Sequence, residues 1–111
     1  MLKIALFGSI AVLLCAAVDA RAVSLPGDEI DRAIVCSVYG GFAPEADPRT
    51  APAKLAIDRT VEEAVASGAR TQAQVRDTFY DTAMQAMKQE PREELIANWN
   101  ECAASFGPDA T

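Results

Sequence analysis

Two cysteines are the residues with the clearest capacity for chemistry in this sequence. The chain has three cysteines, and Cys15 lies in an apolar N-terminal segment, so Cys36 and Cys102 remain once that segment is removed. An even number of cysteines in a short exported chain predicts disulfide pairing, and two cysteines allow one pairing only. The loop-closure model gives such a bond a stabilising effect of roughly 4 kcal/mol. The alternative is a pair of buried free thiols.

The remaining side chains of catalytic type form no recognisable constellation. The sequence has no histidine, which excludes nucleophile-and-base sites of the Ser-His and Cys-His kinds within this chain. Asp77 with Asp81, and Asp58 with Glu62, have the i,i+4 spacing that acid-base or calcium chemistry would need, but both pairs fall on polar helix faces typical of solvated surface. The pair Gly40-Gly41 lacks the rest of a phosphate-binding loop. We therefore expect no enzyme activity, no catalytic residues, no cofactor and no metal ligands.

The first twenty residues have the features of a cleavable signal peptide. Lys3 supplies a positive charge, and residues 4–18 form a fifteen-residue run without any charge. This run is shorter than the roughly 20 apolar residues that span a bilayer. Small or short side chains precede a cut between Ala20 and Arg21. We predict a signal peptide at residues 1–20 and a secreted or periplasmic mature protein.

Two alternatives to a cleaved signal peptide remain open. The segment could stay attached as an uncleaved anchor. It could also be processed as a lipoprotein signal with acylation of Cys15, although the bulky Leu14 before this cysteine disfavours that reading.

The charge of the chain limits its partners. Ten basic and sixteen acidic residues give a net charge of −6, and removal of the signal peptide takes away one of each, Lys3 and Asp19. An acidic domain without a Lys/Arg cluster repels phosphate backbones and anionic lipid. We expect no nucleic-acid binding and no membrane association after signal cleavage. Protein partners, such as another envelope protein, and small cationic partners remain open, and so does the oligomeric state.

The first predicted helix has an acidic opening turn that includes Asp28. The helix dipole favours carboxylates there. Ile34 lies in its apolar stripe, and residues 33–39 have no charge at all, so this helix should be the most central one. The pair Gly40-Gly41 ends it. A buried strand over residues 34–39 is the competing interpretation, because β-branched residues are dense there.

The second predicted helix follows a proline-containing loop and runs from about residue 51 to residue 67. Thr50 is its expected cap. Gly68 follows the helix at the position where a left-handed backbone conformation, which glycine adopts readily, commonly ends a helix. Its inner stripe contains Ala53, Ile57, Val61, Ala64 and Val65. Leu55 falls on the opposite side and is expected to be exposed.

A capping box at Thr71–Gln74 predicts the start of the third helix, and Pro91 is expected as the first residue of the fourth. Gly107 ends the fourth helix. Tyr39 and Tyr80 are expected at the edge of the core. The inner stripe of the third helix is Val75, Phe79, Ala83, Ala86 and Met87, and that of the fourth is Leu95, Trp99, Cys102 and Phe106. Because Cys102 shares the inner face of its helix, its bond would tie the last helix to the first.

The sequence therefore predicts an all-α, four-helix domain with one disulfide joining the first and last helices. The expected organisation is a signal peptide at 1–20, an exposed lead-in at 21–27, a single helical domain at 28–107 and a tail at 108–111. This architecture is similar to that of small periplasmic acid-stress chaperones, although the two cysteines stand further apart than in that family. No residue motif accompanies the likeness.

The functional expectation follows from these exclusions. The leading hypothesis is a non-enzymatic helical module that binds another protein in the cell envelope, with an inhibitor or immunity-like protein as one version of it. The alternative is a periplasmic acid-stress protein of the chaperone kind, which would loosen in acid while the disulfide still holds its helices together. A cryptic small enzyme ranks third.

Overall fold

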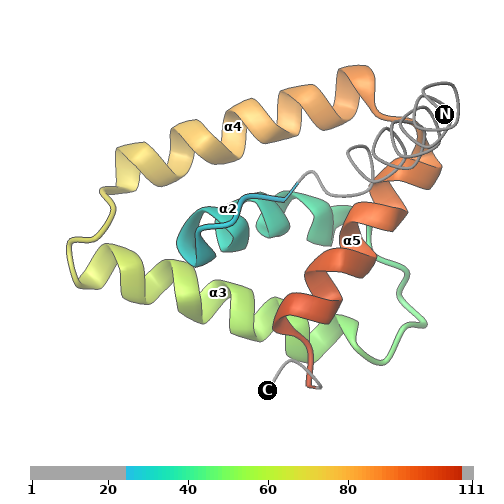
Figure 1. The fold of residues 1–111 in the computed structure, drawn as a ribbon, viewed down its shortest axis with the longest axis horizontal. Helices are drawn as coiled ribbons and strands as arrows, with labels where there is room; N and C mark the ends of the chain where they lie inside the picture. The colour runs from blue at the N-terminus through green and yellow to red at the C-terminus, as the bar shows by residue number, and fades with distance from the viewer. Residues whose placement is uncertain (1–24, 109–111) are drawn as a thin grey trace, which may run out of the picture.

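The computed structural model describes residues 25–108, and these residues form four α-helices, one short 3-10 helix and no strand (Figure 1). This confirms the predicted all-α fold. The predicted signal peptide, the cleavage position between Ala20 and Arg21, and most of the predicted tail lie outside the described residues. The elements are α2 (Glu29–Tyr39), η1 (Gly40–Phe42), α3 (Thr50–Ala66), α4 (Gln72–Gln89) and α5 (Arg92–Phe106).

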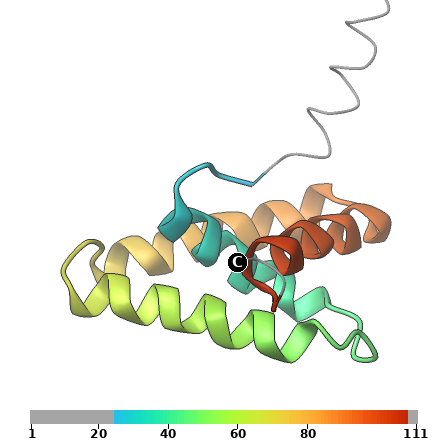
Figure 2. The same cartoon turned by 60° about the horizontal axis from the view of Figure 1, so that its bottom comes forward.

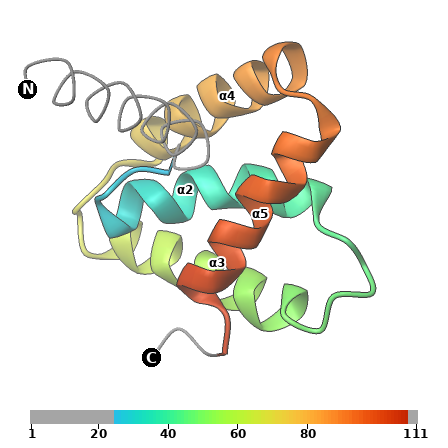
Figure 3. The same ribbon diagram turned by 45° about the vertical axis from the view of Figure 1, so that its right-hand side comes forward.

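Helix α2 lies at the centre, as the absence of charge in residues 33–39 predicts. α3 lies on one side of it, α4 on the other, and α5 crosses both α2 and α3 (Figures 1, 2 and 3). Residues 34–39 are helical, so the strand interpretation of this segment is wrong. Three helices cover α2, and the described residues offer no partner strand, so its β-branched side chains pack as helix core. The buried residues of α2 are Ala33, Ile34, Val35, Cys36, Val38 and Tyr39.

Most helix ends agree with the sequence signals to within one residue. Thr71 forms the predicted capping box, and Gly68 has the predicted left-handed conformation with φ +82°. Asp28 caps α2 instead of lying in its first turn, and its carboxylate accepts a backbone N–H at 2.9 Å. Thr50 is the first residue of α3 and not its cap, and Pro91 precedes α5. These three shifts are small because end signals fix the region of a helix start better than its first residue.

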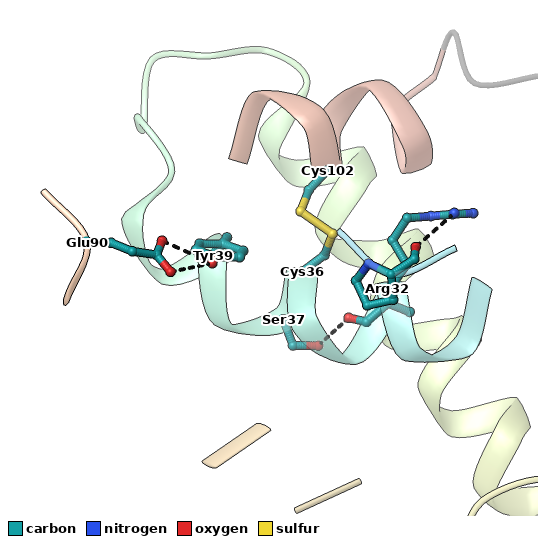
Figure 4. Close-up of a disulfide and its surroundings, with 8 residues drawn as sticks. Arg32, Cys36, Ser37, Tyr39, Glu90 and Cys102 are labelled. Carbon is teal, nitrogen blue, oxygen red and sulfur yellow. Dashed lines mark hydrogen bonds between the residues drawn. A yellow bond between two sulfur atoms is a disulfide. The ribbon is translucent and has the colours of Figure 1, made fainter. Parts of the chain in front are cut away.

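The described end of the lead-in packs against the domain. Leu25 is partly buried and contacts the hydrophobic core. The guanidinium of Arg32 donates hydrogen bonds to the carbonyl oxygens of Gly27 at 3.2 Å and Pro26 at 3.4 Å. The same guanidinium lies 5.9 Å from the ring centroid of Phe106. Arg32 therefore links the lead-in, α2 and the end of α5. Figure 4 shows its hydrogen bond to the lead-in.

Helices α2, α3 and α5 pack against one another in all three pairs, and we refer to them as the three-helix unit. The predicted inner stripe of α5 is confirmed, since all four of its residues are buried. Trp99 is fully buried and is the largest side chain of the core. On α3 the buried residues are Ala53, Ile57 and Ala64, and Leu55 is exposed as predicted.

Helix α4 lies outside this unit and packs chiefly against α2. Ala86 is its single buried residue. The predicted inner stripe of α4 is therefore wrong in part, because Met87 is 74% exposed and Phe79 is 43% exposed. Tyr80, expected at the core edge, is 61% exposed. A helix that meets one neighbour instead of two has only a narrow strip of its surface covered.

Candidate functional site

The predicted disulfide between Cys36 and Cys102 is present and joins α2 to α5 (Figure 4). The two Cα atoms are 5.6 Å apart, and both residues are fully buried. The closed loop contains α3 and α4 entirely. Because solvent does not reach either sulfur, the bond is a structural link and not an exchange site for external thiols.

A carboxylate bridges three helical segments at the junction of α4 and α5. The hydroxyl of Tyr39 donates to both carboxylate oxygens of Glu90, each at 3.0 Å (Figure 4). The side-chain amide of Asn98 donates to Glu90 Oε1 at 3.1 Å. Tyr39 and Asn98 are buried, whereas Glu90 is partly exposed. We call this group the C-terminal clasp, because it holds the end of α4 against α2 and α5.

The phenol of Tyr39 is kept protonated by its surroundings. Burial raises the pKa of Tyr39 far above its ordinary value, and the neighbouring carboxylates of Glu90 and Glu94 raise it further. A phenol in this state donates a hydrogen bond and does not act as a base. The clasp therefore has a structural role and is not an acid-base pair. Sequence reasoning missed it, since nothing in the local pattern relates residue 39 to residue 90.

A second polar group holds the other end of α4. The guanidinium of Arg70, in the turn between α3 and α4, lies 3.0 Å from a carboxylate oxygen of Asp28 and 3.3 Å from one of Asp31. Both aspartates belong to the start of α2. We call this group the N-terminal clasp.

A third ion pair shapes the loop between η1 and α3. Arg49 contacts Asp47 at 2.7 Å, and its guanidinium also donates to Asn100 Oδ1 on α5 at 3.0 Å. The hydrogen bond from Arg49 holds the pKa of the Asp47 carboxyl below its usual range. This pair lies away from α4 in the chain and tethers the loop to α5.

Exposed apolar side chains gather on one side of α4. Three of the five large apolar side chains that are exposed in the described residues belong to this helix, namely Phe79, Tyr80 and Met87. Successive helical residues are rotated by about 100°, so these three and the partly buried Ala83 fall within about a third of the circumference. We call these four residues the α4 flank. The sequence placed Phe79, Ala83 and Met87 on the inner stripe, because periodicity shows which residues share a face but not what covers them.

A cavity of about 430 Å³ lies between η1 and the first turns of α5. Four of its lining residues have apolar side chains, and one, Arg92, is cationic. The lining residues include no carboxylate, so they supply no acid-base pair. The cavity is lined by Gly41, Phe42, Ala43, Arg92, Leu95 and Ile96.

The carboxylate pairs considered in the sequence lie on the surface. Asp77, Asp81, Asp58 and Glu62 are all exposed, as the polar helix faces predicted. Within residues 25–108, no group of three or more cysteine, aspartate and glutamate side chains is arranged to hold a metal ion. In the same residues, no helix combines the length and apolarity that a membrane crossing requires.

Comparison of the chain with protein-family models, with curated proteins and with solved structures gives no significant match.

Proposed function

We propose that the protein is a non-enzymatic binding module of the cell envelope, and that the α4 flank is its contact surface for another protein. The exposure of Tyr80 and Met87 is the observation that supports this proposal best. Exposed apolar side chains that are grouped on one face favour an interaction surface, whereas single ones are ordinary. The lone exposed Leu55 on α3 is an example of the ordinary case.

The chemistry of the flank suits a protein partner. Tyr80 offers an aromatic ring with a polar end, and Met87 offers a flexible, polarisable side chain that adapts to different shapes. The carboxylates of Asp77 and Asp81 are exposed on the adjoining face of the helix. A partner with an apolar centre and a basic rim would complement this arrangement.

The proposed location is the periplasm or the extracellular space. A disulfide persists in oxidising compartments and is rare in the cytosol of mesophiles. The charge-free run after Lys3 has the pattern of an export signal. A partner would then be another envelope or secreted protein, and inhibition or immunity is one form that such binding could take.

The test is site-specific crosslinking in the native envelope. A photoreactive amino acid placed at Met87 should crosslink to a defined partner, and the same residue placed at Leu55 should not. The double variant Tyr80→Ser/Met87→Ser should lose capture of that partner by at least tenfold, while Leu55→Ser retains it. Equal capture by both variants, with far-UV circular dichroism unchanged, would refute the assignment of the flank.

An acid-stress function is the second candidate, and the composition of the two clasps favours it. Each clasp depends on carboxylates, those of Asp28 and Asp31 at one end of α4 and that of Glu90 at the other. Carboxyl groups in general take up protons below about pH 4 and lose the charge that ion pairs require. The test is protection of a client protein from aggregation at about pH 2 to 3, together with dye binding. A protein that keeps its neutral-pH spectrum, binds no dye and protects no client would exclude this candidate.

A further inference from the structure

We propose that α4 opens away from the three-helix unit as a local unit, and that the two clasps at its ends control how often it does so. As a mechanism for regulating partner binding, this inference rests on the proposed function of the α4 flank. The opening itself does not depend on that function.

The packing of α4 differs from that of every helix around it. One of its eighteen residues is buried, whereas six of eleven are buried in α2 and six of fifteen in α5. α3 also has few buried residues, but it packs against both α2 and α5, and α4 packs chiefly against α2. Segments with little apolar burial open at a lower free energy than the global unfolding of a domain.

Polar contacts at the two ends compensate for this thin apolar contact. The N-terminal clasp joins Arg70 to Asp28 and Asp31 at the start of α2. The C-terminal clasp joins Glu90 to Tyr39 at the end of α2. The clasps therefore hold α4 to the two ends of the same helix, along which it lies (Figure 1).

The contacts within the three-helix unit do not depend on α4, so the unit can stay folded when α4 opens. The disulfide joins α2 to α5 directly, and α2, α3 and α5 pack against one another without using α4. The released helix would remain tethered at both ends. Its complete capping box at Thr71 and Gln74, and its many good helix formers, favour residual helix in the open state.

Opening would enlarge the apolar surface that α4 presents. The side of α4 that faces α2 contains Ala86, which is buried, and Val75 and Ala83, which are partly buried. Together with the α4 flank, these residues would make the open helix apolar over about two-fifths of its circumference. A partner that binds the open form better than the closed form would shift the equilibrium toward it.

Hydrogen exchange measured by mass spectrometry tests the opening on the disulfide-bonded protein purified after export. Peptides from residues 72–89 should exchange faster than peptides from α2 and α5. In residues 72–89, Tyr39→Phe should speed exchange by about tenfold, the order expected for losing one charge-assisted hydrogen bond. Arg70→Met removes two ion pairs that are more exposed to solvent, so it should speed exchange there by about two- to fivefold. Peptides from the second half of α5 should keep their rates. The matched control is Asp47→Asn, which breaks the ion pair with Arg49 and should leave α4 unchanged.

Two results would overturn the proposal. Residues 72–89 could exchange at the same rate as the three-helix unit in the parent protein, which would mean that α4 opens only when the whole domain unfolds. Alternatively, the clasp variants could leave α4 unchanged or speed exchange equally in every helix, which would mean that the clasps do not control a local opening. Neither result depends on a partner, so failure of the opening and failure of the proposed function are distinguishable. Loss of partner capture in Tyr80→Ser/Met87→Ser reports on the function alone.

Discussion

Removal of the disulfide is the perturbation whose effect the structure defines best. The double variant Cys36→Ala/Cys102→Ala takes away the bond without introducing hydroxyl groups, which would be buried and costly at these two positions. The two cysteines are 66 residues apart in sequence. In the unfolded chain, the bond therefore closes a loop that contains α3, α4 and most of α5.

The expected loss follows from the length of that loop. The loop-closure model assigns an entropy of about 2.1 + 1.5R ln n cal/mol/K to a loop of n residues, which for this separation is roughly 4 kcal/mol at 25 °C. The total free energy of unfolding of a small domain is only about 5–15 kcal/mol. One kcal/mol shifts the melting temperature of such a domain by about 4–8 °C, so the variant should melt at least about 15 °C below the parent.

The assay is thermal unfolding followed by far-UV circular dichroism at neutral pH. Parent protein that is reduced while unfolded in denaturant and then refolded in reductant is the matched control, because it lacks the bond but keeps the volume of both sulfur atoms. The reduced parent should therefore melt slightly above the alanine variant and well below the oxidised parent. A variant that melts within about 2 °C of the oxidised parent would show that packing alone holds α2 to α5, and the loop-closure argument would fail.

Three further predictions follow from single residues. Because the pKa of Tyr39 is raised on folding, its contribution to stability is complete below pH 10, the ordinary value for tyrosine, and is lost as the pH rises above it. The free energy of unfolding should fall by up to about 1.4 kcal/mol per pH unit there, and urea titrations should show a weaker fall for Tyr39→Phe. Gly68→Ala places a side chain at φ +82° with no atom within 4 Å of the new Cβ, so backbone strain alone should lower the free energy of unfolding by about 1 kcal/mol. The urea midpoint should fall accordingly, and an unchanged midpoint would contradict this prediction. The exported protein should begin at Arg21, and an intact mass that retains residues 1–20 would contradict the cleavage prediction.

Several features of the fold could be predicted because they depend on neighbours in sequence. The capping box at Thr71 satisfies backbone N–H groups within one turn, and Gly68 adopts a conformation that other residues resist. The absence of charge in residues 33–39 left burial as the favourable state for that helix. The disulfide was predictable because one pairing remains when Cys15 is assigned to the predicted signal peptide, and because Cys102 lies on the apolar face of α5.

The polar contacts of the candidate site were not predictable in this way. Glu90 and Tyr39 are 51 residues apart in sequence, and their hydrogen bond exists only because the end of α4 lies beside the end of α2 in the folded chain. Arg70 and Asp31 are 39 residues apart and are brought together by the turn between α3 and α4. A long-range pair of this kind leaves no spacing signal in a single sequence.

The exposure of α4 shows most clearly what each level determines. The sequence by itself determined that residues 72–89 form a helix with an apolar stripe, since periodicity and end signals are properties of one segment. Only the tertiary structure decided that Phe79 and Met87 on that stripe remain exposed. Burial depends on how many neighbours a helix meets, and α4 packs chiefly against one helix whereas α5 packs against two. The physical reason is that amphipathic periodicity gives the direction of an apolar face, while the area covering that face depends on the arrangement of the other helices in space.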